Sequence, residues 1–129
     1  MPIKKELVIV LPNRAGTLAA IANALAKAKV NLLAIDAAGG FEHNIVRFVP
    51  DNAPRAKALL KRRGFDVAES SVLCLYVEDK RGALATLTGK LGRARVNIDY
   101  LYATGSSSHG RELIVIHTSD LKKAAKVLG

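Results

Sequence analysis

The sequence predicts an α+β protein built from two βαββαβ units in tandem, with the last strand missing from the second unit. Each unit is expected to form an antiparallel sheet with its helices on one face. Two observations predict this fold: the second half repeats the first, and each half alternates short apolar runs with helical patterns. A unit of about 60 residues is marginal by itself, so each should lean on the other or on another chain.

The repeat runs without a gap when Leu7 is placed on Leu73. The predicted units are residues 1–71 and 72–129. Similar residues fill many of the paired positions, including Lys27 with Arg93 and Lys29 with Arg95. Identical residues occupy others: Gly16 and Gly82, Leu18 and Leu84, Ala19 and Ala85, Leu25 and Leu91, Ala28 and Ala94, Val30 and Val96, Asn31 and Asn97, Ala37 and Ala103, Gly39 and Gly105.

The first half of each copy reads as strand, turn, helix and strand. Residues 7–11 and 73–77 are apolar and rich in β-branched side chains, which is typical of a strand buried on both faces. A polar turn follows at residues 12–16 and 78–82, and Val-Asn leads into second strands at 31–38 and 97–104. Between them, apolar residues recur at helical spacing: Leu18, Ile21, Ala22, Leu25 and Ala28, then Leu84, Leu87, Leu91 and Ala94.

The second half of each copy adds a turn (39–40 and 105–110), a third strand (44–49 and 111–117) and a second helix. Asp51 or Asn52 should cap this helix in the first copy, and Ser119 or Asp120 in the second. The first copy also has a fourth strand near residues 65–70. With the usual strand order 4-1-3-2, residues 72–77 would be an uncovered edge, so we expect them to pair with another unit or another chain. Cys74, within this run, should be a packed strand residue.

The turn and the helix that follows it resemble the ACT domain, a small ligand-binding module of amino-acid metabolism. The motif is Asn/Asp-x-x-Gly-x-Leu after a strand, then Val-Asn-Ile/Leu after the helix. It occurs at residues 13–18 with 30–32, and again at 79–84 with 96–98. The resemblance covers nearly the whole chain and implies ferredoxin-like units, as in small tandem ACT proteins without a catalytic domain. It also implies that a ligand lies between two units, where the turn of one faces Asn31 or Asn97 of its neighbour.

The turn into each first helix also suits carboxylate binding on physical grounds. Backbone N–H groups at a helix N-terminus lack intrahelical acceptors and lie at the positive end of the helix dipole. Asn and Asp side chains can accept from the ammonium of an amino acid. The predicted ligand-binding residues are Asn13, Arg14, Ala15, Gly16, Leu18 and Asn31 in the first copy, and Asp79, Lys80, Arg81, Gly82, Leu84 and Asn97 in the second.

Structural roles stay open for several of these residues. Asn13 and Asp79 could instead cap the helices, and the two asparagines after the helices could adopt the left-handed conformation common there. Tyr100 and Tyr102 could line a pocket, although strand tyrosines more often pack against neighbours.

The formal net charge of +9 raises nucleic-acid binding as an alternative, since RNA-recognition motifs share the βαββαβ order. The aromatic strand run that stacks bases in those motifs is absent. Solvated helix faces account for the basic clusters, which leaves only a nonspecific, salt-sensitive affinity for nucleic acid. These clusters lie on the second helix of each repeat: Arg55, Lys57, Lys61, Arg62 and Arg63, then Lys122, Lys123 and Lys126.

The preferred function is therefore an amino-acid sensor that forms a homodimer or higher assembly. A basic ferredoxin-like nucleic-acid-binding protein is one alternative. The other is a subunit that regulates an amino-acid biosynthetic enzyme by contact alone and binds no ligand itself.

Catalysis is not indicated by any residue pattern. His43, His109 and His117 lack metal-site spacing, and the Ser/Gly loop at 106–110 has no carboxylate placed to orient a histidine. We expect no enzyme activity, no cofactor and no metal. The apolar run at residues 7–12 is too short for a signal peptide or a membrane span, which predicts a cytoplasmic protein without a membrane partner.

Overall fold

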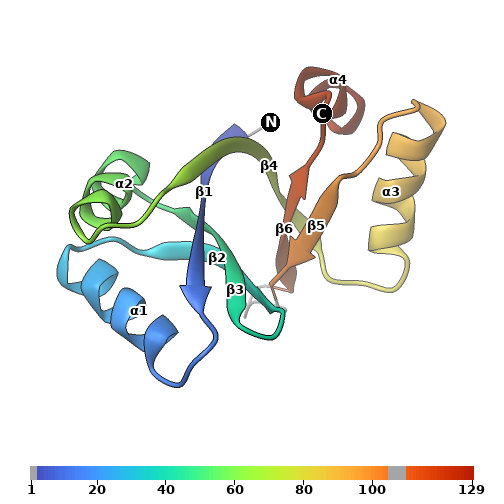
Figure 1. Ribbon diagram of the computed structural model, residues 1–129. Helices are drawn as coiled ribbons and strands as arrows, with labels where there is room; N and C mark the ends of the chain where they lie inside the picture. The colour runs from blue at the N-terminus through green and yellow to red at the C-terminus, as the bar shows by residue number, and fades with distance from the viewer. Residues whose placement is uncertain (1–2, 105–109) are drawn as a thin grey trace. The chain divides into compact units, whose positions relative to one another are not determined.

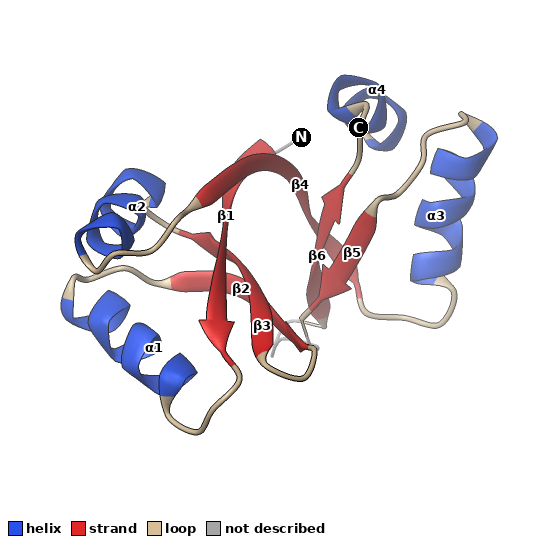
Figure 2. Cartoon of the chain, in the orientation of Figure 1, coloured by secondary structure: helices blue, strands red, loops and turns tan. Residues whose placement is uncertain are grey.

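A computed structural model describes residues 3–104 and 110–129, and this part of the chain contains four helices and six strands (Figures 1 and 2). The predicted α+β class is confirmed. The elements are β1 (Ile3–Pro12), α1 (Thr17–Lys27), β2 (Leu32–Gly39), β3 (His43–Pro50), α2 (Ala53–Arg62), β4 (Ala68–Glu78), α3 (Ala83–Arg93), β5 (Tyr100–Ala103), β6 (Arg111–His117) and α4 (Leu121–Leu128).

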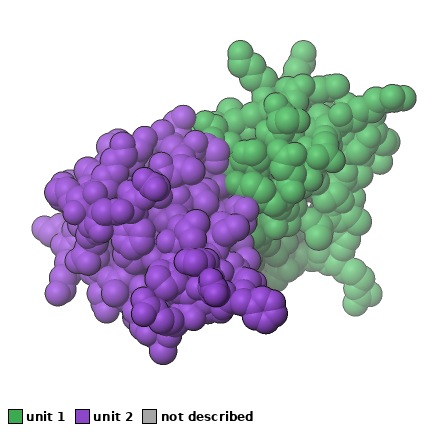
Figure 3. All heavy atoms as spheres, in the orientation of Figure 1, with its two compact units in different colours: residues 1–4, 71–129 green, residues 5–70 purple. Residues whose placement is uncertain are grey.

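The chain divides into two compact units (Figure 3). The N-terminal unit contains residues 5–70 (purple), and the C-terminal unit contains residues 1–4 and 71–129 (green). The boundary lies inside β4, which is one continuous strand. The prediction of separate strands at 65–70 and 72–77 is therefore wrong. The join, Glu69-Ser70-Ser71-Val72, contains neither Gly nor Pro, so nothing in it breaks the extended chain.

In the N-terminal unit, β3 lies between β2 and β1 and pairs antiparallel with both, with Leu7 opposite Phe48. Both helices of the unit lie on one face of these strands (Figure 1). On the opposite face Val10 is 51% exposed and Ile45 is 43% exposed. The prediction that β1 is buried on both faces is therefore wrong. Alternation of side chains along the strand explains this difference. The buried core is Leu7, Ile9, Leu11, Ile21, Leu25, Val30, Val46, Phe48, Ala56 and Leu60.

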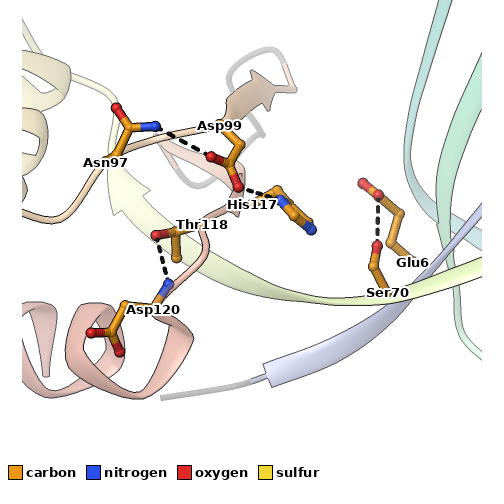
Figure 4. Close-up of polar contacts among 7 residues, drawn as sticks. All are labelled: Glu6, Ser70, Asn97, Asp99, His117, Thr118 and Asp120. Carbon is orange, nitrogen blue, oxygen red and sulfur yellow. Dashed lines mark hydrogen bonds and ion pairs between the residues drawn. The ribbon is translucent and has the colours of Figure 1, made fainter.

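A buried carboxylate lies on the other face of β1, opposite the face that carries Leu7. Glu6 on β1 is fully buried and accepts a hydrogen bond from Ser70 Oγ, 3.4 Å from Glu6 Oε1 (Figure 4). A buried carboxylate is costly unless it is hydrogen-bonded, so the beginning of β4 has a polar role as well as a strand role.

In the C-terminal unit, β6 lies between β4 and β5, again antiparallel, with Leu73 opposite Ile116. The side chains of residues 72–75 are buried, and Cys74 is 1% exposed, which confirms its prediction as a packed strand residue. Tyr76 is 63% exposed, so burial on both faces ends before the strand does. The buried core is Leu73, Leu75, Leu87, Leu91, Val96, Ile114, Ile116 and Ala124.

The second helix of each unit begins with a side-chain cap. Asn52 Oδ1 accepts from the backbone N–H of Arg55 at 3.1 Å, and Asp120 Oδ1 accepts from that of Lys123 at 3.2 Å. Both residues are among those that the sequence offered as caps, and the two units therefore start this helix in the same way.

The first helix of each unit ends on a non-glycine residue in the left-handed conformation. Lys29 has φ 61° and Arg95 has φ 60°. The turn is closed by Val30 N–H to Leu25 O and by Val96 N–H to Leu91 O, both at 2.9 Å. Glycine is the usual residue at such a position because a Cβ makes this conformation unfavourable.

Replacing Lys29 or Arg95 by glycine is therefore expected to raise the free energy of unfolding by roughly 0.5–1 kcal/mol, measured by urea denaturation. The matched control is Ala28→Gly, one position earlier, where φ is −82°. There glycine only adds chain entropy to the unfolded state, so a loss of about 0.5–1 kcal/mol is expected. Equal destabilisation by all three substitutions would contradict the left-handed assignment.

Candidate functional site

Asn13, the first residue of the predicted binding turn, forms hydrogen bonds to the β2–β3 hairpin. Its Nδ2 donates to the carbonyl oxygens of Gly40 at 3.1 Å and Phe41 at 3.3 Å, and its backbone N–H donates to Glu42 O at 2.7 Å. The helix cap is Gly16, not Asn13. The predicted capping role of Asn13 is therefore wrong, because its amide is committed to the hairpin turn.

Asp79 is the counterpart of Asn13 in the second copy, but its side chain has different surroundings. Its backbone N–H donates to Gly110 O at 2.7 Å, while its exposed side chain forms no hydrogen bond or ion pair within residues 3–104 and 110–129. Gly82 is the cap of α3, so the capping role is wrong for Asp79 too. His109 and most of the predicted turn at 105–110 lie outside the described residues.

Both turns enter their helices through a glycine in the left-handed region, Gly16 with φ 88° and Gly82 with φ 85°. The N–H groups of the first helical residues, Thr17 and Ala83, donate to Arg14 O and Lys80 O in the turn. The two N–H groups after them, those of Leu18 and Ala19 and of Leu84 and Ala85, have no acceptor in the described chain. Each helix start therefore presents two free donors to solvent. The rest of each turn is also exposed: Arg14, Ala15 and Gly16, then Lys80, Arg81 and Gly82.

The two predicted asparagines differ in their surroundings. Asn31 donates its backbone N–H to Asp51 Oδ1 at 3.0 Å, and its side-chain amide makes no hydrogen bond to the described residues. Asn97 instead donates from Nδ2 to Asp99 Oδ1 at 3.2 Å (Figure 4). Neither asparagine takes the left-handed conformation, which Lys29 and Arg95 occupy instead. That alternative for the asparagines is therefore wrong.

A polar chain on β5 and β6 was not predicted from the sequence. Asp99 Oδ2 lies 3.0 Å from His117 Nδ1 (Figure 4). The His117 ring stacks on Tyr100 at 4.8 Å between centroids. Tyr100 stacks in turn on Tyr102 at 6.5 Å, which agrees with the expected packing role of both tyrosines. The β5–β6 register sets His117 opposite Tyr100, and single-residue patterns do not reveal that pairing.

A pocket of about 340 Å³ adjoins the second predicted turn. Its sides come from the end of β4, from α3 and from the last residue of α4. Glu78 and Lys80 form an ion pair at 3.4 Å beside it, and Lys90 adds a second cation. The lining residues are Leu75, Tyr76, Val77, Glu78, Lys80, Ala83, Thr86, Leu87, Lys90 and Leu128.

A larger hollow of about 660 Å³ occurs in the N-terminal unit between β1 and residues 64–68. It contains none of the predicted ligand-binding residues. Both hollows combine apolar residues with charges of both signs. The smaller pocket is the better candidate, because it contains Lys80 of the predicted turn and adjoins the start of α3.

Two classes of site find no support in the described residues. No group of three or more His, Cys, Asp or Glu side chains within residues 3–104 and 110–129 could hold a metal ion. Over the same residues, the helices are too short and too polar for one of them to cross a membrane.

Comparison with known proteins places these features in context. The sequence profile described as "ACT domain pair" matches residues 1–128. The structure of protein BT0572 from Bacteroides thetaiotaomicron is 30% identical, with a TM-score of 0.90 over 98% of this chain and 86% of that one. The ligand-free regulatory subunit of aspartate kinase from Thermus thermophilus has the same fold at 14% identity, with a TM-score of 0.72 over 99% of this chain and 95% of that one. A search of curated proteins finds no match.

Proposed function

Because this chain belongs to the ACT domain family as a pair of such domains, we propose that it is a regulatory protein that binds a free amino acid. The regulatory subunit of aspartate kinase shares its fold, which supports regulation in amino-acid metabolism in general. Its effect would be exerted through binding rather than catalysis. A ligand that binds one arrangement of the protein better than another shifts the population toward that arrangement.

The observation that carries this proposal is the pocket beside the Asp79–Leu84 turn. At about 340 Å³ it is at the small end of ligand pockets, which suits a single amino acid. Lys90 and Lys80 can receive the carboxylate, while the carboxylate of Glu78 can receive the ammonium. Leu75, Leu87 and Leu128 offer an apolar surface, so the preferred ligand has an apolar side chain.

The family resemblance adds a second element to the proposal. The turns at 13–18 and 79–84 would face Asn31 and Asn97 of a neighbouring ACT unit, with the ligand held at the interface between them. Support comes from the free N–H groups at both helix starts and from the unengaged amide of Asn31. A site of this kind requires association of ACT units, so we expect a homodimer or higher assembly, with a metabolic enzyme as the regulated partner.

A thermal-shift screen of the free amino acids tests the function. An amino acid at 100 times its Kd should add about 2.7 kcal/mol of stability, with saturation as its concentration rises. Lys90→Gln should weaken that ligand's binding by roughly tenfold or more, because a hydrogen bond to a charged group contributes about 1.5–3 kcal/mol. The matched control is Lys126→Gln on α4, an exposed lysine that does not line the pocket.

Calorimetric measurement of amino-acid affinity in the Asn31→Ala and Asn97→Ala variants distinguishes a ligand held at an interface between units from a ligand held in the pocket alone. Weaker binding in the Asn31 variant supports the interface proposal, and unchanged affinity in both variants removes the asparagines from it. A protein that no amino acid stabilises, but that still co-purifies with a biosynthetic enzyme, would instead be the ligand-independent subunit.

A further inference from the structure

All four helices lack acidic residues. The 11 Asp and Glu residues lie in strands, turns and loops. Lys and Arg occur once on α1, four times on α2, twice on α3 and three times on α4. Lys57, paired with Glu69 at 3.6 Å, is the one helix cation with an ion-pair partner among the described residues. A helix face that is merely solvated usually mixes both signs of charge, so this segregation calls for a partner.

Three exposed cations lie where the first helix of the N-terminal unit ends and its second helix begins. The strands between them bring these two points together, since Asp51 N–H donates to Asn31 O at 2.9 Å. Arg55 Nη1 donates to Ala28 O at 3.4 Å, which holds the guanidinium at the end of α1. Lys27 and Lys29 flank Ala28 and are exposed, as is Arg55. We call Lys27, Lys29 and Arg55 the N-terminal basic corner.

The C-terminal unit has cations at the corresponding ends of its two helices. Arg93 and Arg95 replace Lys27 and Lys29 at the end of α3. Lys123 replaces Arg55, because each donates its backbone N–H to the cap of its helix. Asp99 N–H donates to His117 O at 2.9 Å, which brings the end of α3 and the start of α4 together. Arg93, Arg95 and Lys123 are exposed and form the C-terminal basic corner.

One cation in each corner is held in an unfavourable backbone conformation. Lys29 and Arg95 are the residues with φ near +60°, where glycine would be about 0.5–1 kcal/mol better. Both copies therefore carry a long cationic side chain at a position that favours no side chain at all. Backbone strain of this kind concentrates at functional positions, which indicates a use for the charge.

We infer that the two basic corners bind the phosphate backbone of nucleic acid. The corner residues line neither of the two pockets described above, so their ligand is an extended polyanion rather than a small phosphate. Three exposed cations within one corner can neutralise adjacent phosphates. The aromatic run with which RNA-recognition motifs stack bases is absent from the sequence, which implies binding without base recognition. This inference does not rest on the proposed binding of an amino acid.

An anionic membrane is the less suitable partner for these surfaces. Surface-bound helices need large apolar side chains next to their cations. The exposed large apolar residues on these helices are Leu18 and Leu84, at their N-terminal ends. Nine residues separate each from the last helical cation, roughly 13 Å along the axis at the standard helical rise.

Fluorescence anisotropy with a labelled duplex DNA of about 20 base pairs, over a range of NaCl concentrations, tests the inference. Two triple variants each neutralise one corner. The first is Lys27→Gln with Lys29→Gln and Arg55→Gln, and the second is Arg93→Gln with Arg95→Gln and Lys123→Gln. Each should reduce the slope of log K against log salt by about 2.7. At about 0.1 M salt this corresponds to a loss of affinity on the order of a hundredfold.

The matched control is a triple variant with Lys4→Gln, Lys5→Gln and Arg111→Gln, which removes three positive charges from strands. It should leave the slope of log K against log salt nearly unchanged. Circular dichroism melts confirm that each variant is folded. The inference is overturned if the control loses as much affinity as a corner variant, if the parent protein fails to bind DNA at low salt, or if phosphatidylserine vesicles bind more tightly than DNA.

Discussion

Truncation of Leu91 to alanine should cost about 2–5 kcal/mol of the free energy of unfolding, and Leu25→Ala should cost a similar amount. The two leucines occupy the same position in the two copies and are 0% and 1% exposed. Each substitution removes buried methyl groups and leaves a cavity that a close-packed core refills only in part. Urea denaturation followed by circular dichroism gives the measurement.

Leu84→Ala and Leu18→Ala are the matched controls on the same two helices. Their side chains are 47% and 38% exposed, so each should cost well under half as much as its buried counterpart. The paired variants also report on cooperativity. If the two units unfold together, both core variants shift a single transition; otherwise each shifts only the transition of its own unit.

Gly82→Ala and Gly16→Ala should each destabilise the protein by roughly 1–2 kcal/mol. Both glycines have φ between 85° and 88°, and a Cβ built on either meets no atom within 4 Å. The cost therefore comes from the backbone conformation and not from a clash. The same substitutions should weaken amino-acid binding, because the free N–H groups that follow each glycine depend on this turn.

Gly92→Ala is the control that separates conformation from composition. Gly92 lies inside α3 without a positive φ, and its added Cβ also meets nothing within 4 Å. Alanine is the better helix former there, so stability should rise by about 0.5–1 kcal/mol. A loss of stability at Gly92, or none at the two turn glycines, would contradict the assigned backbone conformations.

The duplicated architecture was predictable because it follows from the periodic spacing of apolar side chains along the sequence. Strands, turns and helices recur at one offset, and glycine marks both helix starts, since a left-handed residue there favours glycine. The break between the units was not predictable in the same way. Whether residues 65–78 form one strand or two depends on which neighbours pair with them, and pairing partners lie far away in the sequence.

The roles of individual polar residues were the least predictable part of the site. Asn13 and Asp79 share a position in the repeat, yet Asn13 donates to the β2–β3 hairpin while the Asp79 carboxylate forms no hydrogen bond to residues 3–104 or 110–129. An amide can donate to the hairpin carbonyls, and an ionised carboxylate cannot. Similarly, the Asn97 side chain donates a hydrogen bond to Asp99, two residues later. The first copy has Leu33 at the position of Asp99, so Asn31 has no such acceptor there.

The part of β4 that pairs with β6 tolerates only certain changes in length, because side chains alternate between the two faces along a strand. One residue gained or lost between Leu73 and Leu75 would turn Leu75 away from the core of the C-terminal unit and turn Tyr76 toward it. Only even changes keep the pattern, so this segment accepts insertions far less readily than a loop of the same length would.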